Sequence, residues 1–236
     1  MGVHPLQTIA EIDWSSMPMA DLPNPWSVVR PEEGGVSAQD VASGLFAASL
    51  FPYLAFLAFI GDKDTRTPPL ANFGFRFLLV FVFATIPAGI VAKLRYGTIL
   101  ANCDVLHGTS ESLLTLTNLF ISLGFRRSLT GGRQAGADML ALAAPLLLPL
   151  LAGALPDLAG EPANALSLPT WGIHVSSLFE WLVAMSLIWR YADETGNPRW
   201  RGLTWAMLPL HTSGLAACTY HVLYNAPAVD WLVGAP

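Results

Sequence analysis

The sequence predicts an all-α fold, a polytopic transmembrane helical bundle of about six spans built from two tandem repeats. Hydrophobic residues make up 53% of the 236 residues and charged residues only 12%, which is about half the charged share of a soluble domain. The apolar residues gather in runs that approach the ~20 residues a helix needs to cross a bilayer. Because the charged residues lie between these runs, we expect lipid to cover much of the surface.

The second half of the chain is similar to the first. Residues 49–96 align without a gap with residues 177–224. The alignment pairs Tyr53 with Trp181, Ile60 with Ile188, Thr67 with Thr195, Gly74 with Gly202 and Tyr96 with Tyr224. Such self-similarity marks a unit used twice, and repeats are a common way to build polytopic membrane proteins. We therefore expect a first transmembrane repeat at 39–128 and a second at 166–236, truncated before a counterpart of the third span.

The first three expected spans are Ala38–Ile60, Phe73–Val91 and Thr109–Leu123. The first two are almost continuously apolar, with the cores VASGLFAASLFPYLAFLAFI and FLLVFVFATIPAGIV, and have the length of bilayer-crossing helices. The third is the shortest and the most polar. Thr115, Thr117 and Asn118 make it polar on one side, so that side should face the bundle or another subunit rather than lipid.

The last three expected spans are Met139–Leu158, Ile173–Trp189 and Leu203–Leu223. The fourth carries prolines, each of which removes a backbone donor, so it should be kinked or re-entrant within a connecting segment at 129–165. The fifth and sixth are apolar runs, HVSSLFEWLVAMSLIW and WAMLPLHTSGLAACTYHVL, that contain a few ionisable residues. Residues 1–38 are polar and acidic, which suits an extended arm lying on a partner.

Arginine and lysine predict the orientation, because connections on the cytoplasmic side of a membrane carry an excess of them. With six spans, nine of the twelve basic residues fall on one side and three on the other. The nine are Lys63, Arg66, Arg76, Arg126, Arg127, Arg133, Arg190, Arg199 and Arg201. We therefore expect the connections after the first, third and fifth spans to face the cytoplasm or stroma, with both termini opposite.

The sequence lacks the signatures of an enzyme and of a nucleic-acid-binding protein. The net charge is −5, and no basic patch is present. No nucleophile elbow, Walker loop, HExxH or dinucleotide fingerprint occurs. Cys103 and Cys218 occupy non-equivalent repeat positions and belong to no CxxC motif. We therefore predict a non-catalytic protein with no nucleic-acid partner and no metal other than one held in a tetrapyrrole.

Four histidines are the main candidates for cofactor binding. His107, His174 and His221 should lie near one membrane face, before the third span, at the start of the fifth and at the end of the sixth. His211 should lie about 15 Å deeper along its helix. Intramembrane ionisable groups tend to mark ligands, pathways or partners. The imidazoles are therefore candidate ligands of a tetrapyrrole metal, one for chlorophyll magnesium or two for haem iron.

The alternative is that these histidines are neutral and hydrogen-bonded between helices, since polar residues also hold membrane helices together. Among the candidates His221 ranks first, because two flanking tyrosines could cover a macrocycle. His211 and His174 follow. His107 ranks last, because it should lie in a loop-like stretch that water can reach.

Three further side chains are weaker candidates. Glu180 falls near the middle of the fifth span, opposite Pro52 in the repeat, so the repeat does not require it. It would ligate magnesium, carry a proton or pair with a histidine or partner, or else remain a protonated carboxyl that donates a hydrogen bond. Asn118 and Asn225 are candidates for weak magnesium ligands or hydrogen-bond partners.

Longer motifs occur in both halves. The second half contains HVSSLFEW at 174–181, WRGL at 200–203 and CTYHVLYN at 218–225. The first half contains LFPYL at 50–54, TIPAG at 85–89 and HGTSESLLTLTN at 107–118. With these motifs the chain resembles two cyanobacterial and chloroplast membrane-protein families of unknown function, fused in tandem, one of them first recorded as a hypothetical chloroplast reading frame. The resemblance covers roughly 45–127 and 166–236, and it implies a photosynthetic membrane but no reaction.

Together these observations predict a non-catalytic, multi-pass subunit of a photosynthetic supercomplex in the thylakoid membrane, with photosystem I as the first choice. Such a subunit would bind chlorophyll and carotenoid, contact lipid, and bridge core and antenna subunits. The alternatives are a thylakoid assembly factor, a bis-histidine haem redox protein and a small-molecule transporter. The transporter ranks last because Glu180 has no counterpart in the first repeat.

Overall fold

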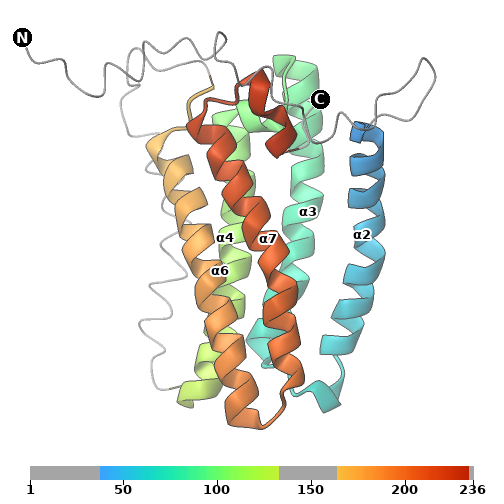
Figure 1. Ribbon diagram of the computed structural model, residues 1–236, viewed down its shortest axis with the longest axis vertical. Coiled ribbons are helices and arrows are strands. Elements are labelled where there is room, and N and C mark those ends of the chain that lie inside the picture. The colour runs from blue at the N-terminus through green and yellow to red at the C-terminus, as the bar shows by residue number, and fades with distance from the viewer. Residues whose placement is uncertain (1–37, 133–163, 234–236) are drawn as a thin grey trace, which may run out of the picture.

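The computed structural model describes residues 38–132 and 164–233, and this part of the chain is entirely helical (Figure 1). Its α-helices are α2 (Ala38–Ile60), α3 (Pro69–Tyr96), α4 (Asp104–Thr130), α6 (Leu168–Thr195) and α7 (Arg199–Val222). Its short 3-10 helices are η4 (Lys63–Thr65), η5 (Leu100–Asn102) and η6 (Pro227–Leu232). The all-α prediction is therefore confirmed for the described residues. The expected fourth span Met139–Leu158 lies outside them, as does nearly all of the arm.

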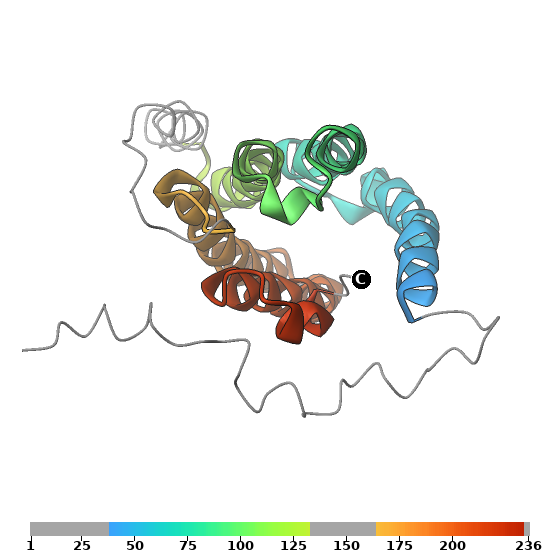
Figure 2. The same ribbon diagram turned by 90° about the horizontal axis from the view of Figure 1, so that it is seen from above.

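The long helices run side by side and form an open arc in the order α2, α3, α4, α6, α7 (Figure 2). Neighbours in this arc are antiparallel except for α4 and α6, which run parallel, so that both begin at the same end of the bundle. Helix α4 is central, because it packs against α3 on one side and α6 on the other. Helices α2, α4 and α6 all end at the same end of the bundle, as six alternating spans would require (Figure 1). Eight of the nine basic residues predicted for one side are described, and they belong to this end.

The expected first span agrees with α2, but the third differs from its prediction. Helix α4 is 27 residues long and not the shortest. Its polar residues are buried between neighbouring helices and include Ser110, Ser112, Thr115, Thr117, Asn118 and Ser122. A helix enclosed by protein need not be apolar, so hydropathy underestimated its length. The prediction that its polar side faces the bundle is confirmed.

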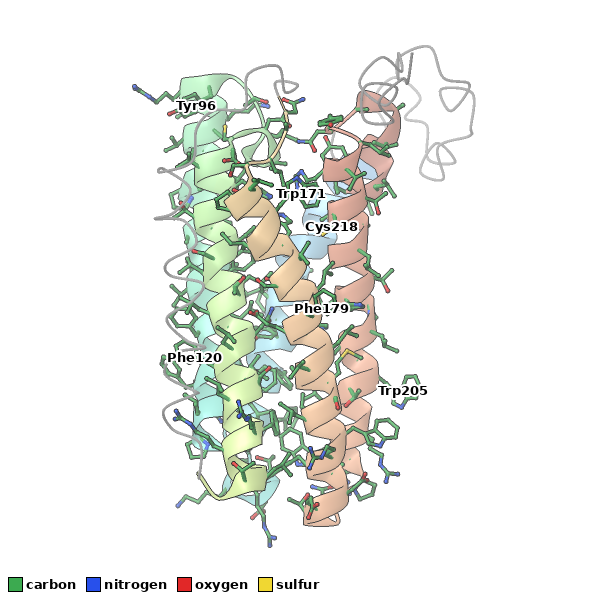
Figure 3. All side chains as sticks on the ribbon, turned by 90° about the vertical axis from the view of Figure 1, so that its left-hand side faces the viewer. Tyr96, Phe120, Trp171, Phe179, Trp205 and Cys218 are labelled. Atoms are coloured by element: carbon green, nitrogen blue, oxygen red, sulfur yellow. The ribbon has the colours of Figure 1, made fainter. Side chains whose placement is uncertain are left out.

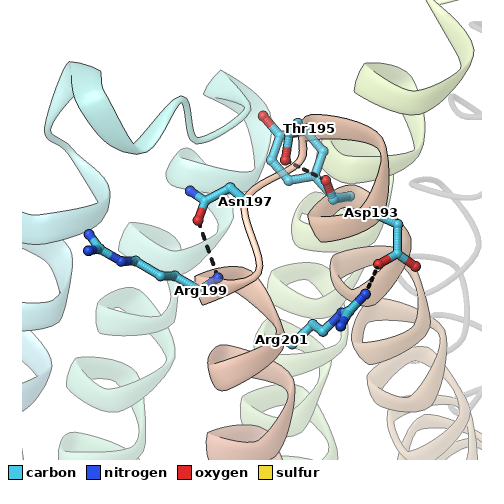
Figure 4. A network of polar contacts seen from close by, with 6 residues as sticks. Asp193, Thr195, Asn197, Arg199 and Arg201 are labelled. Atoms are coloured by element: carbon cyan, nitrogen blue, oxygen red, sulfur yellow. Dashed lines mark hydrogen bonds and ion pairs between the residues drawn. The ribbon is translucent and has the colours of Figure 1, made fainter.

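The main hydrophobic core lies at the end with the basic connections. Rings of Phe125, Tyr191 and Trp200 pack edge to face there, with centroids 5.2–5.6 Å apart. The Tyr191 hydroxyl donates a 2.5 Å hydrogen bond to the Arg66 carbonyl, which ties α6 to the α2–α3 connection. Two polar contacts hold the tight turn from α6 to α7 (Figure 4). Arg201 forms an ion pair with Asp193, and the backbone N–H of Arg199 donates to Oδ1 of Asn197.

The outer surfaces of the helices are apolar. Helices α3 and α6 are long and apolar enough to cross a membrane by length and composition, with mean hydropathies of 2.2 and 1.3 in their best windows. The apolar part of α2, Ala47–Ile60, is shorter. Large side chains on the outside include Phe51, Phe59, Leu94, Phe179 and Trp205, each at least 63% exposed, and Figure 3 shows Trp205 pointing away from the bundle. Helices α3 and α6 indicate membrane association. Two such helices do not by themselves establish six spans.

The two helical hairpins place repeat-related residues in similar roles. Tyr53 on α2 donates a hydrogen bond to the carbonyl of Phe75 on α3 at 2.5 Å. Its counterpart Trp181 on α6 donates to the carbonyl of Met207 on α7 at 2.9 Å. In each hairpin, therefore, an aromatic donor on the first helix bonds to the backbone of the second.

Candidate functional site

Three of the four predicted histidines meet at the end of the bundle opposite the basic connections. His107 lies in the first turn of α4, His174 in the second turn of α6 and His221 in the last turn of α7. Their ligand nitrogens all lie within 4.8 Å of one another. The ring centroids are 4.9–5.0 Å apart in all three pairs. The rings thus form a nearly equilateral group, which we call the histidine cluster.

Close contact between α4 and α6 brings His107 to His174. A Cβ on Gly108 would lie 2.5 Å from Oγ1 of Thr170, so only glycine allows the two helices to approach this closely. The backbone N–H of Ser167, the residue that caps α6, donates to Oδ1 of Asp104 at 2.9 Å. The start of α6 is thereby fixed beside the start of α4.

Asn225 orients the third histidine from an unusual backbone position. Its φ of 55° is left-handed, a conformation in which asparagine is enriched among non-glycine residues. The repeat-equivalent residue is Gly97, which caps α3 with a φ of 65°. From this position Asn225 Oδ1 lies 2.9 Å from His221 Nδ1. Its amide Nδ2 donates to Oδ1 of Asn102 at 2.6 Å and to the Ala101 carbonyl at 3.3 Å.

These partners fix the tautomers of two rings. His174 Nδ1 lies 2.9 Å from the Thr170 carbonyl, which can only accept, so this nitrogen carries the proton. His221 Nδ1 likewise donates to Asn225, whose amide nitrogen is already engaged with two acceptors. In the neutral rings Nε2 of both histidines is therefore unprotonated and can accept a hydrogen bond. His107 Nε2 lies 3.0 Å from His174 Nε2 and donates to it.

The histidine cluster is enclosed by protein and contains no other donor type. His174 and His221 are 7% and 3% exposed, and His107 is partly buried. The Trp171 ring, labelled near this end in Figure 3, meets the rings of His174 and His221 edge-on at 6.4 and 6.5 Å. Within the described residues no cysteine or carboxylate belongs to the group. The site therefore offers three imidazoles in an enclosed setting.

The other predicted residues lie elsewhere or play other roles. His211 is outside the histidine cluster on α7, and its Nδ1 is buried without a partner in the described residues. The same holds for Asn118 Oδ1 and Glu180 Oε2. Asn225 is a hydrogen-bond partner of His221, one of its two predicted roles.

The prediction that His107 lies in a loop, which placed it last among the candidates, is wrong. Helix α4 begins at Asp104 and includes His107. The polar stretch around Gly108 suggested a loop, but it is the face of α4 that packs on α6. The roles of Asp104 and Thr170 were not predicted. An acid just before an apolar-periodic run is a helix-start signal, and that signal would have moved the start of α4 to Asp104.

Each half of the chain matches a known protein family. Residues 42–130 match a family described as protein of unknown function (DUF3593), and residues 165–235 match one described as protein of unknown function (DUF2499). The Ycf49-like protein of Synechocystis sp. is 53% identical over 70 residues, which are 30% of this chain and 67% of that relative. No solved structure matches the chain. The chain therefore belongs to the Ycf49-like family, and it carries the two units of unknown function in tandem.

Proposed function

We propose that the protein is a non-catalytic, multi-pass subunit of a photosynthetic complex in the thylakoid membrane, with photosystem I as the complex to test first. The distribution of polarity across the bundle carries this proposal. Thr115, Thr117 and Asn118 are at most 2% exposed, whereas Phe51, on the outer surface, is 74% exposed. In water this arrangement would be unfavourable, because exposed apolar surface costs free energy. Lipid and neighbouring apolar subunits remove that cost.

The charge distribution supports an orientation for this subunit. The basic connections after α2, α4 and α6 would face the stroma, following the excess of arginine and lysine on that side of membranes. The histidine cluster lies at the other end of the bundle and would then face the lumen.

Association with other subunits is supported by polar atoms that find no partner within the described residues. Buried polar atoms without a partner are costly, and Asn118, Glu180 and His211 each present one in the described residues. The arc of helices is open between α2 and α7 (Figure 2). Neighbouring subunits or pigments would supply the contacts that the half-buried Glu180 and His211 lack.

Chlorophyll and carotenoid binding is part of the proposal, with His211 now preferred to His221 as magnesium ligand. A macrocycle on any member of the histidine cluster would have to displace the other two rings, whose nitrogens lie within 4.8 Å. A haem iron bound by both His107 and His174 would hold their nitrogens about 4 Å apart, because each imidazole–metal bond is about 2 Å long. In the structure their Nε2 atoms are only 3.0 Å apart. His211 has no such neighbour among the described rings.

Native gels of thylakoids solubilised in mild detergent test the association. We expect the tagged protein to comigrate with photosystem I in a stoichiometric amount and to leave that position in a strain that lacks the photosystem. Comigration with newly made complexes alone would support the assembly-factor alternative. A free monomer under all conditions would contradict the proposal.

Pigment counts test the ligand. The His211→Leu variant should lose one chlorophyll per chain, while Thr212→Ala, a neighbouring exposed position whose hydroxyl bonds within its own helix, should keep it. Equal pigment content in both variants would exclude His211 as a ligand.

A further inference from the structure

We propose that His107, His174 and His221 together bind one divalent transition-metal ion, which joins α4, α6 and α7 at one end of the bundle. The inference does not depend on membership of a photosynthetic complex, since the site lies within a single chain. It rests on the placement of three nitrogens, on the groups that hold the rings and on the chemistry of the donor set.

The nitrogens are placed around one point. Three imidazoles on a tetrahedral ion at 2.0–2.1 Å have nitrogens about 3.4 Å apart. In this structure one ligand nitrogen from each ring lies within 4.8 Å of the other two, and the Nε2 atoms of His107 and His174 are 3.0 Å apart. Small movements of side chains therefore suffice to surround an ion. The ion would replace the shared proton, and His107 would stay neutral by carrying its proton on Nδ1.

The outer nitrogens of two rings already have the partners that metal-binding histidines have. Such histidines almost always donate their other N–H to a carbonyl, carboxylate or water, which fixes the tautomer and the ring orientation. His174 donates to the Thr170 carbonyl and His221 to the Asn225 side chain. Both rings thus present an unprotonated Nε2, and the lone pair of His174 Nε2 accepts the hydrogen bond from His107 until an ion takes its place.

The position taken by Asn225 sets this pattern apart from ordinary packing. Gly97 occupies the equivalent place in the first hairpin and has the same left-handed backbone. The second hairpin has a side chain there, at a backbone conformation that costs asparagine less than most residues. That side chain makes three hydrogen bonds, one of which orients His221.

The donor set selects the class of ion. Neutral imidazoles suit zinc, copper, nickel and iron, whereas magnesium and calcium prefer oxygen ligands. No thiolate belongs to the site in the described residues, which disfavours soft Cu(I). Three protein ligands leave a fourth position for water or another small group on Zn²⁺. The Asp104 carboxylate interacts electrostatically with His174 and His221 and would offset part of the charge of the ion.

Metal titration of the purified full-length protein tests the site. The protein should carry an affinity tag without histidines, be stripped with a chelator in detergent, and be titrated with Zn²⁺ and, in a parallel arm, Cu²⁺. We expect one Zn²⁺ per chain by calorimetry and elemental analysis. His174→Ala and His221→Ala should each abolish this binding. His4→Ala removes a histidine other than the three cluster histidines and should leave the stoichiometry at one.

A second variant keeps the test valid if the histidine variants fail to fold. Asn225→Gly restores the residue found at the equivalent place, Gly97, so the left-handed backbone is retained. Losing an outer partner of a metal ligand typically costs 10- to 100-fold in affinity. We therefore expect Asn225→Gly to weaken Zn²⁺ binding by that factor while the apo-protein still folds, at a lower unfolding temperature because the bonds to Ala101 and Asn102 are lost.

Three results would overturn the inference. One is the absence of stoichiometric Zn²⁺ or Cu²⁺ binding by the folded wild-type protein. Another is binding that survives loss of both His174 and His221. The third is an Asn225→Gly variant that binds Zn²⁺ as tightly as wild type. Each would assign the cluster to hydrogen bonding between helices.

Discussion

Replacement of Gly108 by alanine should separate α4 from α6 at the histidine cluster. The new Cβ would lie 2.5 Å from Oγ1 of Thr170 and 3.3 Å from its Cβ and Cγ2. Ordinary contacts of this kind are 3.4–4 Å, so the helices must move apart by about 1 Å or the Thr170 side chain must leave its rotamer. Overpacking of this type costs about 1–3 kcal/mol. Gly108→Ala should lower the free energy of unfolding by that amount.

A compensating substitution makes this prediction specific. Thr170→Ala removes both Oγ1 and Cγ2, while the Thr170 backbone carbonyl that accepts from His174 stays in place. The double variant Gly108→Ala/Thr170→Ala should therefore regain at least half of the stability that Gly108→Ala loses. Residues in contact give such non-additive effects, which a double-mutant cycle measures.

The assay is denaturant or thermal unfolding of the four proteins in the same detergent, followed by Zn²⁺ titration. Gly108→Ala should also weaken Zn²⁺ binding, because His107 adjoins the displaced position, and the double variant should recover it. Two outcomes would refute the reasoning: a Gly108→Ala protein within 0.5 kcal/mol of wild type, the usual range of neutral surface changes, or strictly additive effects in the double variant.

Three further changes test other contacts. Tyr191→Phe removes the hydroxyl bonded to the Arg66 carbonyl and should cost about 1 kcal/mol; unchanged thermal unfolding would contradict this. Asp104→Ala removes the acceptor for the Ser167 N–H and should destabilise the protein by about 1 kcal/mol. Asp104→Asn keeps an oxygen acceptor and should destabilise it less. Equal losses of stability in the two variants would argue against this hydrogen bond. Zn²⁺ at 100 times its dissociation constant should stabilise the wild type by about 2.7 kcal/mol and leave His221→Ala unchanged, so equal shifts in melting temperature would rule out binding at the cluster.

The sequence predicts that the three histidines lie at the same end of the bundle, but it does not predict that their rings are in contact. Alternating spans place His107, His174 and His221 at one end whatever the packing, and the structure agrees. Whether the rings touch depends on how closely α4 and α6 approach, which the contact between Gly108 and Thr170 decides. That contact joins residues 62 positions apart, and no local pattern encodes it.

The length of α4 was underestimated for a related reason. Hydropathy measures the preference of a segment for lipid, but α4 contacts other helices along much of its length, where buried residues such as Thr115 and Asn118 are accommodated. Ser177 on α6 pairs with Thr115 at 2.7 Å. A helix whose polar side chains are buried against other helices has a weak hydropathy signal although it is well ordered in the bundle.

The histidine cluster draws on both units of the chain. The unit at 42–130 supplies His107, and the unit at 165–235 supplies His174 and His221. Wherever these two units are made as separate polypeptides, neither would possess the full set of three rings. The cluster could then form only at a subunit interface, and metal occupancy would report that the two polypeptides had assembled. Fusion into one chain makes that assembly independent of protein concentration.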